Sequence, residues 1–168
     1  MEVRSIKAVI KALNDAHVKY LIVGGVAVVA HGYERFTRDL DLVIGLEPGN
    51  IRRGLHSLLA IGYALKIPVT PEQFADAKLR EEWRLEKNMI VLQLWSDEHK
   101  RTPIDVFVYE PFDFAKEYNR AEQYSVEDQM APIVSRETLI KLKKAAGRAQ
   151  DLADIEKLEK IDTLRKKR

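Results

Sequence analysis

The stretch from Tyr20 to Ile44 constrains the fold of this chain more than any other part of it. It begins with a short apolar run, continues through Gly24-Gly25 into a set of small residues, and ends in a second apolar run that carries Asp39 and Asp41. We predict a strand, a tight turn, a helix and a second strand. Residues two apart in a strand point to the same face, so the two aspartates project together while the leucines between them turn to the core.

Composition sets broad limits on the rest of the 168-residue chain, which is 46% hydrophobic and 32% charged and contains no cysteine. One domain with a sizeable core is expected at this length. The absence of cysteine excludes disulfides, thiolate zinc sites and a cysteine nucleophile. A net charge of +2 is too small to indicate nucleic-acid binding. The sequence lacks a bilayer-spanning apolar run and a signal peptide, so we expect a cytoplasmic protein without a membrane partner.

Hydrophobic periodicity predicts the remaining elements. Helices are expected over residues 3–16, 50–60, 136–146 and 150–164, with a polar helical segment from Thr70 to Lys87; strands are expected over residues 20–23, 39–44, 89–95 and 104–109. Pro48-Gly49 is interpreted as ending the second strand, and the chain after Pro111 as less regular until Ser135. The basic residues 165–168 are interpreted as a solvated tail.

These elements predict an α/β (α+β) domain whose mixed β-sheet is flanked by helices. The short polar link over residues 96–103 favours an antiparallel pair, which argues against a purely parallel sheet. We expect a core over residues 1–110 and a C-terminal strand and helical extension over residues 111–168, packed together as one compact unit.

Three carboxylates stand out, namely Asp39 and Asp41 on one predicted strand and Asp105 within another apolar run. If the two strands are neighbours, these side chains converge on one spot. Carboxylates without His or Cys favour Mg²⁺ or Mn²⁺ over zinc. The plainer alternatives are a solvated alternating strand for the first two, and a turn cap or an ion pair with Arg101 for the third.

The Gly24-Gly25 turn adds a second requirement of phosphate chemistry. Glycines let the backbone approach a phosphate, and the following helix directs its N–H groups toward that anion. Taken alone, the turn is more often an ordinary tight turn. Two metal ions beside such a turn would clamp the attacking and leaving oxygens of an in-line phosphoryl transfer.

The combination of a Gly-Gly turn, thirteen residues, Asp-Leu-Asp and a later single Asp resembles the nucleotidyltransferase superfamily of DNA polymerase beta. The details Arg35-Phe-Thr37-Arg-Asp39 and Lys143-Lys-Ala-Ala-Gly147-Arg148 resemble small bacterial nucleotidyltransferases related to AbiEii-type toxins and to antibiotic nucleotidyltransferases. The resemblance extends from Tyr20 to Leu158. Toxin relatives usually have Lys-Asp-x-x-Asp where this chain has Gln150-Asp-Leu-Ala-Asp, so that motif is incomplete here.

The resemblance implies a nucleotidyltransferase fold and a role for each motif residue. Asp39 and Asp41 would hold two Mg²⁺ or Mn²⁺ ions and the nucleoside triphosphate (NTP), and Asp105 would help to hold the catalytic metal and deprotonate the acceptor hydroxyl. The residues that would contact the nucleotide are Gly24, Gly25, Arg35, Thr37, Arg38, Lys143 and Arg148. A surface role is an equal alternative for Arg38, and a solvated helix face is the alternative for Arg148.

The function predicted in this way is transfer of a nucleoside monophosphate from an NTP to an acceptor hydroxyl, with release of pyrophosphate. RNA, protein and small molecules are all open as acceptors, and a toxin of the AbiEii type would have an antitoxin as partner. The alternatives are a non-catalytic nucleotide-binding sensor and an antibiotic nucleotidyltransferase. The roughly 58 residues after Glu110 argue against the second alternative, because such enzymes usually carry a larger C-terminal helical domain.

Overall fold

A computed structural model describes residues 1–166, without the side chains of residues 162 and 164–166. The predicted solvated tail at residues 165–168 therefore lies outside the described side chains. The elements follow one another in the order α1 (Val3–Asp15), β1 (Tyr20–Ile22), α2 (Gly24–Ala30), β2 (Leu40–Ile44), α3 (Pro48–Ala60), β3 (Ala64–Leu65), α4 (Pro71–Ala75), α5 (Ala77–Glu86), β4 (Val91–Trp95), β5 (Ile104–Phe107), α6 (Phe114–Asn119), β6 (Glu122–Val126), β7 (Gln129–Ile133), α7 (Arg136–Ala146) and α8 (Ala149–Lys166).

One mixed sheet organises the molecule, with the strand order β3-β4-β5-β2-β1-β7-β6. The β1–β2, β4–β5 and β6–β7 pairs are antiparallel, whereas β2–β5 and β1–β7 are parallel. The prediction of a mixed α/β fold is confirmed, as is the antiparallel pair joined by residues 96–103. The two strands that carry the predicted carboxylates are neighbours at the centre of the sheet.

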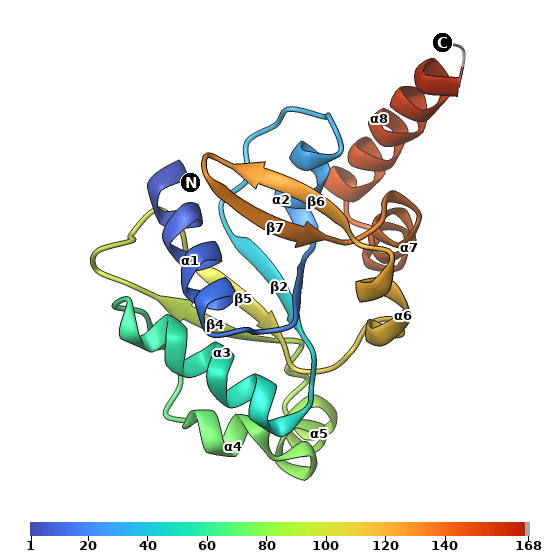
Figure 1. Cartoon of the computed structure of the whole chain (residues 1–168). Coiled ribbons are helices and arrows are strands. Elements are labelled where there is room, and N and C mark those ends of the chain that lie inside the picture. Colours follow the sequence, from blue (N-terminus) through green and yellow to red (C-terminus); the bar gives the residue numbers. More distant parts are fainter. Residues whose placement is uncertain (167–168) are drawn as a thin grey trace.

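Helices cover both faces of this sheet (Figure 1). On one face, α1 and α3 bury a large apolar cluster that includes Ile10, Leu55 and alternate strand residues such as Leu42. On the other face, α6 and α7 close over a smaller cluster that includes Leu21 and Leu139. The last described element, α8, extends away from the sheet at the upper right of Figure 1.

The segment that was predicted to be less regular, between Pro111 and Ser135, holds α6 and the β6–β7 hairpin. That expectation was wrong because α6 has only six residues and β7 contains Pro132, a residue that weakens a strand pattern. The parallel β1–β7 pairing is short, with Ile22 opposite Ile133, and Pro132 lies opposite Gln123 in the antiparallel β6–β7 pair. This hairpin joins the sheet directly beside β1.

Two other boundaries differ from the sequence prediction. Pro48 begins α3 instead of ending the preceding strand segment, because the Glu47 carboxylate accepts hydrogen bonds from the N–H groups of Gly49 and Asn50 at 2.9 and 2.7 Å. The polar helical segment after Thr70 is divided at Asp76, which ends α4 and caps α5. Neither difference changes the placement of the carboxylates.

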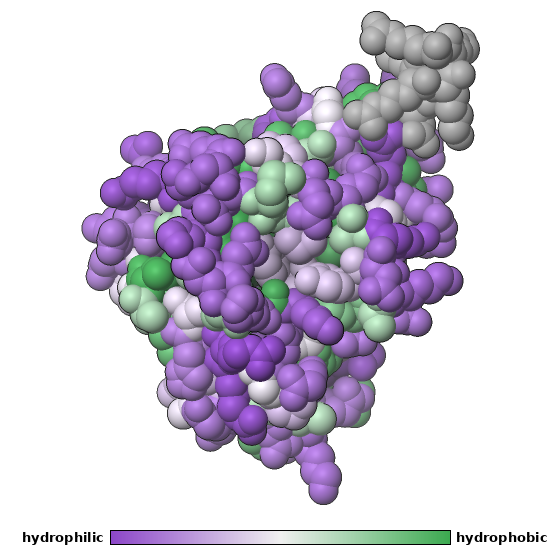
Figure 2. Space-filling model, viewed as in Figure 1, coloured by the Kyte–Doolittle hydropathy of each residue, from purple (hydrophilic) through white to green (hydrophobic). Residues whose placement is uncertain are grey.

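The molecular surface is mostly hydrophilic in the view of Figure 2, where apolar side chains form small separate groups. Within residues 1–166, no helix combines the length and apolar character needed to cross a bilayer.

Candidate active site

The turn between β1 and α2 places glycine directly against a carboxylate. Gly24 has φ +61°, in the left-handed region, and a Cβ atom built on it would lie 1.9 Å from Asp41 Oδ2. The adjacent Gly25 N–H donates a hydrogen bond to the Asp41 carboxylate. The turn is held to the second strand, since the Val23 N–H donates to the Asp41 carbonyl at 3.0 Å. Glycine is required here both by the backbone conformation and by the approach of Asp41.

Asp41 and Asp105 are register partners on the parallel strands β2 and β5, so they lie side by side on one face of the sheet. Asp39 precedes β2, and its charge raises the pKa of both. Burial is the largest cause of the raised pKa of Asp41, which reaches about 7, followed by the charges of Asp105 and Asp39. Burial likewise raises the pKa of Asp105, against a lowering hydrogen bond from Gln93. The sheet thus gathers three mutually repelling carboxylates.

A cavity of about 510 Å³ opens beside these carboxylates. Its lining comes from the β1–α2 turn, the ends of β2, β4 and β5, and the C-terminal part of α7: Val23, Gly24, Asp41, Ile90, Val91, Asp105, Phe107, Tyr109, Pro111, Leu139, Leu142, Lys143, Ala145, Ala146, Arg148 and Asp151. Asp39 lines a neighbouring hollow together with Arg38. Two of the three predicted carboxylates therefore face the cavity, and the third stands at its side.

Lys143 and Arg148, the two cations predicted to contact a triphosphate, both line this cavity. Lys143 is 5% exposed, with its Nζ 3.1 Å from Asp151 Oδ1 and 2.7 Å from Asp154 Oδ2. Arg148 is exposed, and its Nε lies 2.7 Å from Asp151 Oδ2. The charges of Lys143 and Arg148 interact with that of Asp41 across the cavity. This arrangement provides positive charge opposite the carboxylates.

Arg35 and Thr37 stabilise the loop between α2 and β2 and do not line the cavity. The Arg35 guanidinium makes two contacts of 2.9 Å with the buried Asp154 carboxylate. Thr37 packs against Gly25, where an added Cβ would lie 2.3 Å from Thr37 Oγ1. The loop that carries Asp39 is thereby tied to α8. Arg38 is exposed at the neighbouring hollow.

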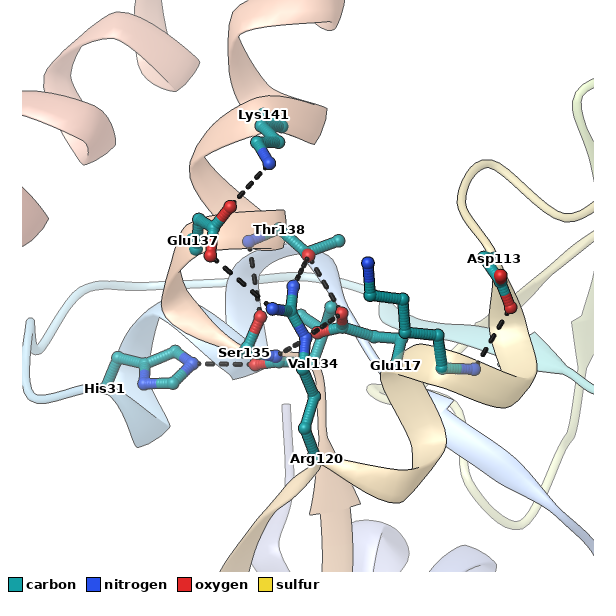
Figure 3. A network of polar contacts seen from close by, with 10 residues as sticks. His31, Asp113, Glu117, Arg120, Val134, Ser135, Glu137, Thr138 and Lys141 are labelled. Carbon is teal, nitrogen blue, oxygen red and sulfur yellow. Dashed lines mark hydrogen bonds and ion pairs between the residues drawn. The ribbon is translucent and has the colours of Figure 1, made fainter.

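A polar network at the start of α7 fixes the direction of the helix that carries Lys143 (Figure 3). The buried Glu117 carboxylate accepts hydrogen bonds from the Ser135 N–H at 2.7 Å and the Thr138 hydroxyl at 2.9 Å, and pairs with Arg120 Nε at 2.7 Å. Burial raises the pKa of Glu117, but these hydrogen bonds outweigh burial and lower it. A charged Glu117 therefore anchors the N-terminus of α7 to α6.

No family model matches this chain, and no curated protein matches it in sequence. Solved structures do match it in fold. A lincosamide antibiotic adenylyltransferase, LnuA, crystallised with lincomycin, superposes with a TM-score of 0.63 at 15% identity, over 94% of this chain and 96% of LnuA. An antigenic nucleotidyltransferase-like protein from Paracoccidioides brasiliensis superposes with a TM-score of 0.56 at 17% identity, over 97% of this chain and 76% of the other.

This chain has the nucleotidyltransferase fold. The predicted resemblance to the nucleotidyltransferase superfamily is confirmed at the level of the fold, and the closer resemblance to AbiEii-type toxins stays a prediction. In this nucleotidyltransferase fold the Gly-Gly turn and the Asp-Leu-Asp strand lie in contact.

The side chains of the site fit a hard divalent cation by their chemistry. Among residues 1–166, no group of three or more His, Cys, Asp or Glu side chains stands close enough to form a ready-made metal cage. However, Asp105 Oδ1 is buried and has no hydrogen-bond partner among the described residues. The pKa of Asp41 is raised first by burial and then by the charges of Asp105 and Asp39, which a cation would offset. Oxygen ligands of this kind suit Mg²⁺ or Mn²⁺.

Sequence reasoning did not include the apolar part of the cavity lining. Phe107 and Tyr109 follow Asp105 at intervals of two, and Ile90 and Leu142 face the same cavity. The signal that could have found Phe107 is the strand period itself, because a strand that directs Asp105 into the site directs Phe107 to the same face.

The metal-free protein should lose stability as the pH rises from about 4 to 7. The pKa of Asp41 is about 7 in the folded state, above its ordinary value of 3.8, so the folded state holds a proton that the unfolded state releases. The stability that this proton contributes is complete below pH 4 and is lost as the pH rises through 7. The proton on Asp41 can contribute at most about 4 kcal/mol to the free energy of unfolding, and water at the open side of the cavity reduces this contribution.

Urea unfolding of the wild type and Asp41→Asn at several pH values, with chelator present, measures this effect. We expect the wild type to become less stable relative to the variant as the pH rises, because asparagine does not titrate. A constant difference between the two proteins across this pH range would show that Asp41 has an ordinary pKa.

Proposed function

We propose that this protein is a metal-dependent nucleotidyltransferase that moves a nucleoside monophosphate from an NTP to an acceptor hydroxyl and releases pyrophosphate. The observation that carries the proposal is the contact of the Gly24 turn with Asp41, beside Asp105, in a cavity that Lys143 and Arg148 also line. Phosphoryl transfer requires positioning and charge stabilisation more than covalent chemistry from the protein, and this cavity supplies both.

Asp39, Asp41 and Asp105 would hold the divalent cations. The resemblance to the superfamily implies that two cations bind. When bound, Mg²⁺ or Mn²⁺ would offset the charge of the triphosphate and polarise the phosphate that reacts. Arg148 also lines the cavity, and its side chain, 78% exposed and paired with Asp151 through Nε, would contact the outer phosphates. Lys143 contributes a fixed positive charge to the cavity wall, because its ion pairs with two buried aspartates hold it in place.

In the reaction, the acceptor oxygen forms a bond to the α-phosphorus while the bond from that phosphorus to the bridging oxygen breaks. Pyrophosphate leaves with the bridging oxygen. The proton of the acceptor hydroxyl passes to the Asp105 carboxylate, which lies beside Asp41 on the neighbouring strand. The buried, unpartnered Asp105 Oδ1 is the oxygen available for this role or for a cation.

The acceptor class is left to experiment. LnuA is an antibiotic adenylyltransferase of nearly the same extent, so the size of this chain is compatible with a small-molecule acceptor. RNA and protein acceptors, together with a toxin role and an antitoxin partner, rest on the sequence resemblance to AbiEii-type proteins. If the toxin proposal is correct, induced expression should stop the growth of a bacterial host, and the Asp39→Ala/Asp41→Ala variant should not.

An acceptor survey tests the proposal. Purified protein is incubated with Mg²⁺, each of the four α-labelled NTPs, and in turn total RNA, cell lysate or a panel of antibiotics. The Asp39→Ala/Asp41→Ala variant is the control, because it keeps the rest of the cavity and removes two carboxylates. Label that enters one fraction with the wild type alone identifies the acceptor class. Metal-dependent NTP binding without transfer to any fraction would instead favour a sensor.

A further inference from the structure

The face of the sheet that carries Asp41 and Asp105 changes from polar to apolar along β5. Asp105 and Phe107 are two residues apart and point to the same face. On the neighbouring strand, Gln93 stands opposite Asp105, and Val91 stands opposite Phe107. A step of two residues covers about 7 Å along a strand. The carboxylates and the aromatic residues therefore occupy successive positions along one wall of the same cavity.

The second wall of the cavity, formed by α7, combines one charged side chain with apolar ones. Lys143 lines the cavity together with the carboxylates, whereas Leu142 and Ala146 add apolar surface to it. The apolar lining of the cavity also includes Ile90 and Pro111, and Ile90 is 45% exposed. Among these apolar residues and the two aromatic residues of the first wall, only the Tyr109 hydroxyl is a side-chain hydrogen-bonding group.

Two aromatic rings stand in a fixed arrangement at this apolar end. The Phe107 and Tyr109 ring centroids are 6.0 Å apart with an interplanar angle of 61°, an edge-to-face geometry. The Arg84 guanidinium lies over the Tyr109 ring, 4.7 Å from its centroid. Contacts on more than one side hold Tyr109 in place, so an aromatic surface is present before any ligand binds.

We propose that the apolar end of the cavity, formed by Ile90, Phe107, Tyr109 and Leu142, binds the nucleobase of the NTP and selects purines over pyrimidines by contact area. The inference rests on the proposed function, because it assigns the triphosphate to the charged end of the same cavity. A two-ring base covers more of this apolar surface than a one-ring base. Adenine and guanine differ in the hydrogen-bonding groups on their edges. Among these four side chains only the Tyr109 hydroxyl can form a hydrogen bond, so we expect similar affinities for the two purines.

Binding measurements with and without the base test this inference. Titration calorimetry with Mg²⁺ compares ATP, GTP, CTP, UTP and inorganic tripolyphosphate on the wild type, Phe107→Ala and Phe107→Leu. The leucine variant keeps apolar volume and guards against a folding defect in the alanine variant. Trp95→Ala is the matched control, because Trp95 is an aromatic residue of β4 that is 43% exposed and does not line the cavity.

We expect the wild type to bind ATP and GTP about fivefold more tightly than CTP and UTP, with the two purine nucleotides within about threefold of each other. Phe107→Ala should weaken purine nucleotide binding about tenfold, leave tripolyphosphate binding unchanged and remove most of the purine preference. Phe107→Leu should lie between the two, and Trp95→Ala should behave as the wild type.

Equal affinities for purine and pyrimidine nucleotides in the wild type would overturn the inference while leaving the proposed function intact. The same holds if Phe107→Ala weakens tripolyphosphate and ATP equally, since the loss would then not concern the base. If the wild type binds neither tripolyphosphate nor any NTP with Mg²⁺, the proposed function fails and this inference fails with it.

Discussion

Asp41→Asn should reduce nucleotidyl transfer by about 10²–10³-fold or more, with the protein still folded. Asp41 is placed between Gly24 and Asp105, so its carboxylate is the one that contacts the glycine turn and a second carboxylate at once. Asparagine keeps the shape of the side chain but removes the negative charge that a divalent cation requires. The same change relieves repulsion in the empty site, so the metal-free variant should be at least as stable as the wild type at pH 7.5.

Thermal unfolding with Mg²⁺ and a non-hydrolysable NTP analogue separates this effect from general damage. A ligand at one hundred times its dissociation constant stabilises the wild type by about 2.7 kcal/mol, and the metal-dependent part of this stabilisation should disappear in Asp41→Asn. Asp97→Asn is the matched control, because Asp97 is exposed in the link between β4 and β5. An unchanged metal-dependent shift in Asp41→Asn would contradict the assignment of the site.

Lys143→Met should lower the free energy of unfolding by about 3 kcal/mol. Lys143 is buried between the carboxylates of Asp151 and Asp154, which are themselves 2% and 0% exposed. Burial raises the pKa of Asp151, but hydrogen bonds from Arg148 and Lys143 outweigh it and lower the pKa. Methionine fills the space of the lysine stem but leaves the two buried charges with less compensation, and removing one partner of a buried pair is strongly destabilising.

The remaining ion pairs set the size of this loss. Asp154 keeps its contacts with Arg35, and Asp151 keeps those with Arg148, so we expect the lower end of the range for buried pairs. Urea unfolding at pH 7.5 measures the change. Lys144→Met is the control, since the neighbouring Lys144 is 61% exposed and lies 3.8 Å from Glu159, and it should cost less than about 1 kcal/mol. Equal losses in both variants would show that the Lys143 cluster does not act as a buried ion-pair network.

Asp41→Asn and Lys143→Met together separate the chemistry of the cavity from its scaffold. Asp41→Asn is expected to affect cation and nucleotide binding with little loss of stability. Lys143→Met is expected to affect stability first, because the same lysine joins α7 to α8 at the cavity wall.

The sequence by itself determined those parts of the site that depend on local pattern. Glycines in a turn, alternation in a strand and the span of a helix are short-range features, and α7 covers residues 136–146 as predicted. From the sequence, Asp41 and Asp105 could be expected to converge only if their two strands were neighbours. The structure shows that β2 and β5 are neighbours, which the sequence could not establish. Pairing between strands far apart in the sequence depends on the packing of the whole domain and not on local propensity.

The tertiary structure alone decided the partners of the charged residues. Arg35 was predicted to reach phosphates, yet it pairs with Asp154 on α8, far along the chain. Asp151 and Asp154 belong to the stretch that resembles the toxin motif in part, and the structure buries both against Lys143. Charge and helical spacing do not reveal such contacts, because a buried ion pair depends on which helices pack together. The division of the cavity into a charged end and an apolar end likewise appears only when β5 and α7 face each other across it.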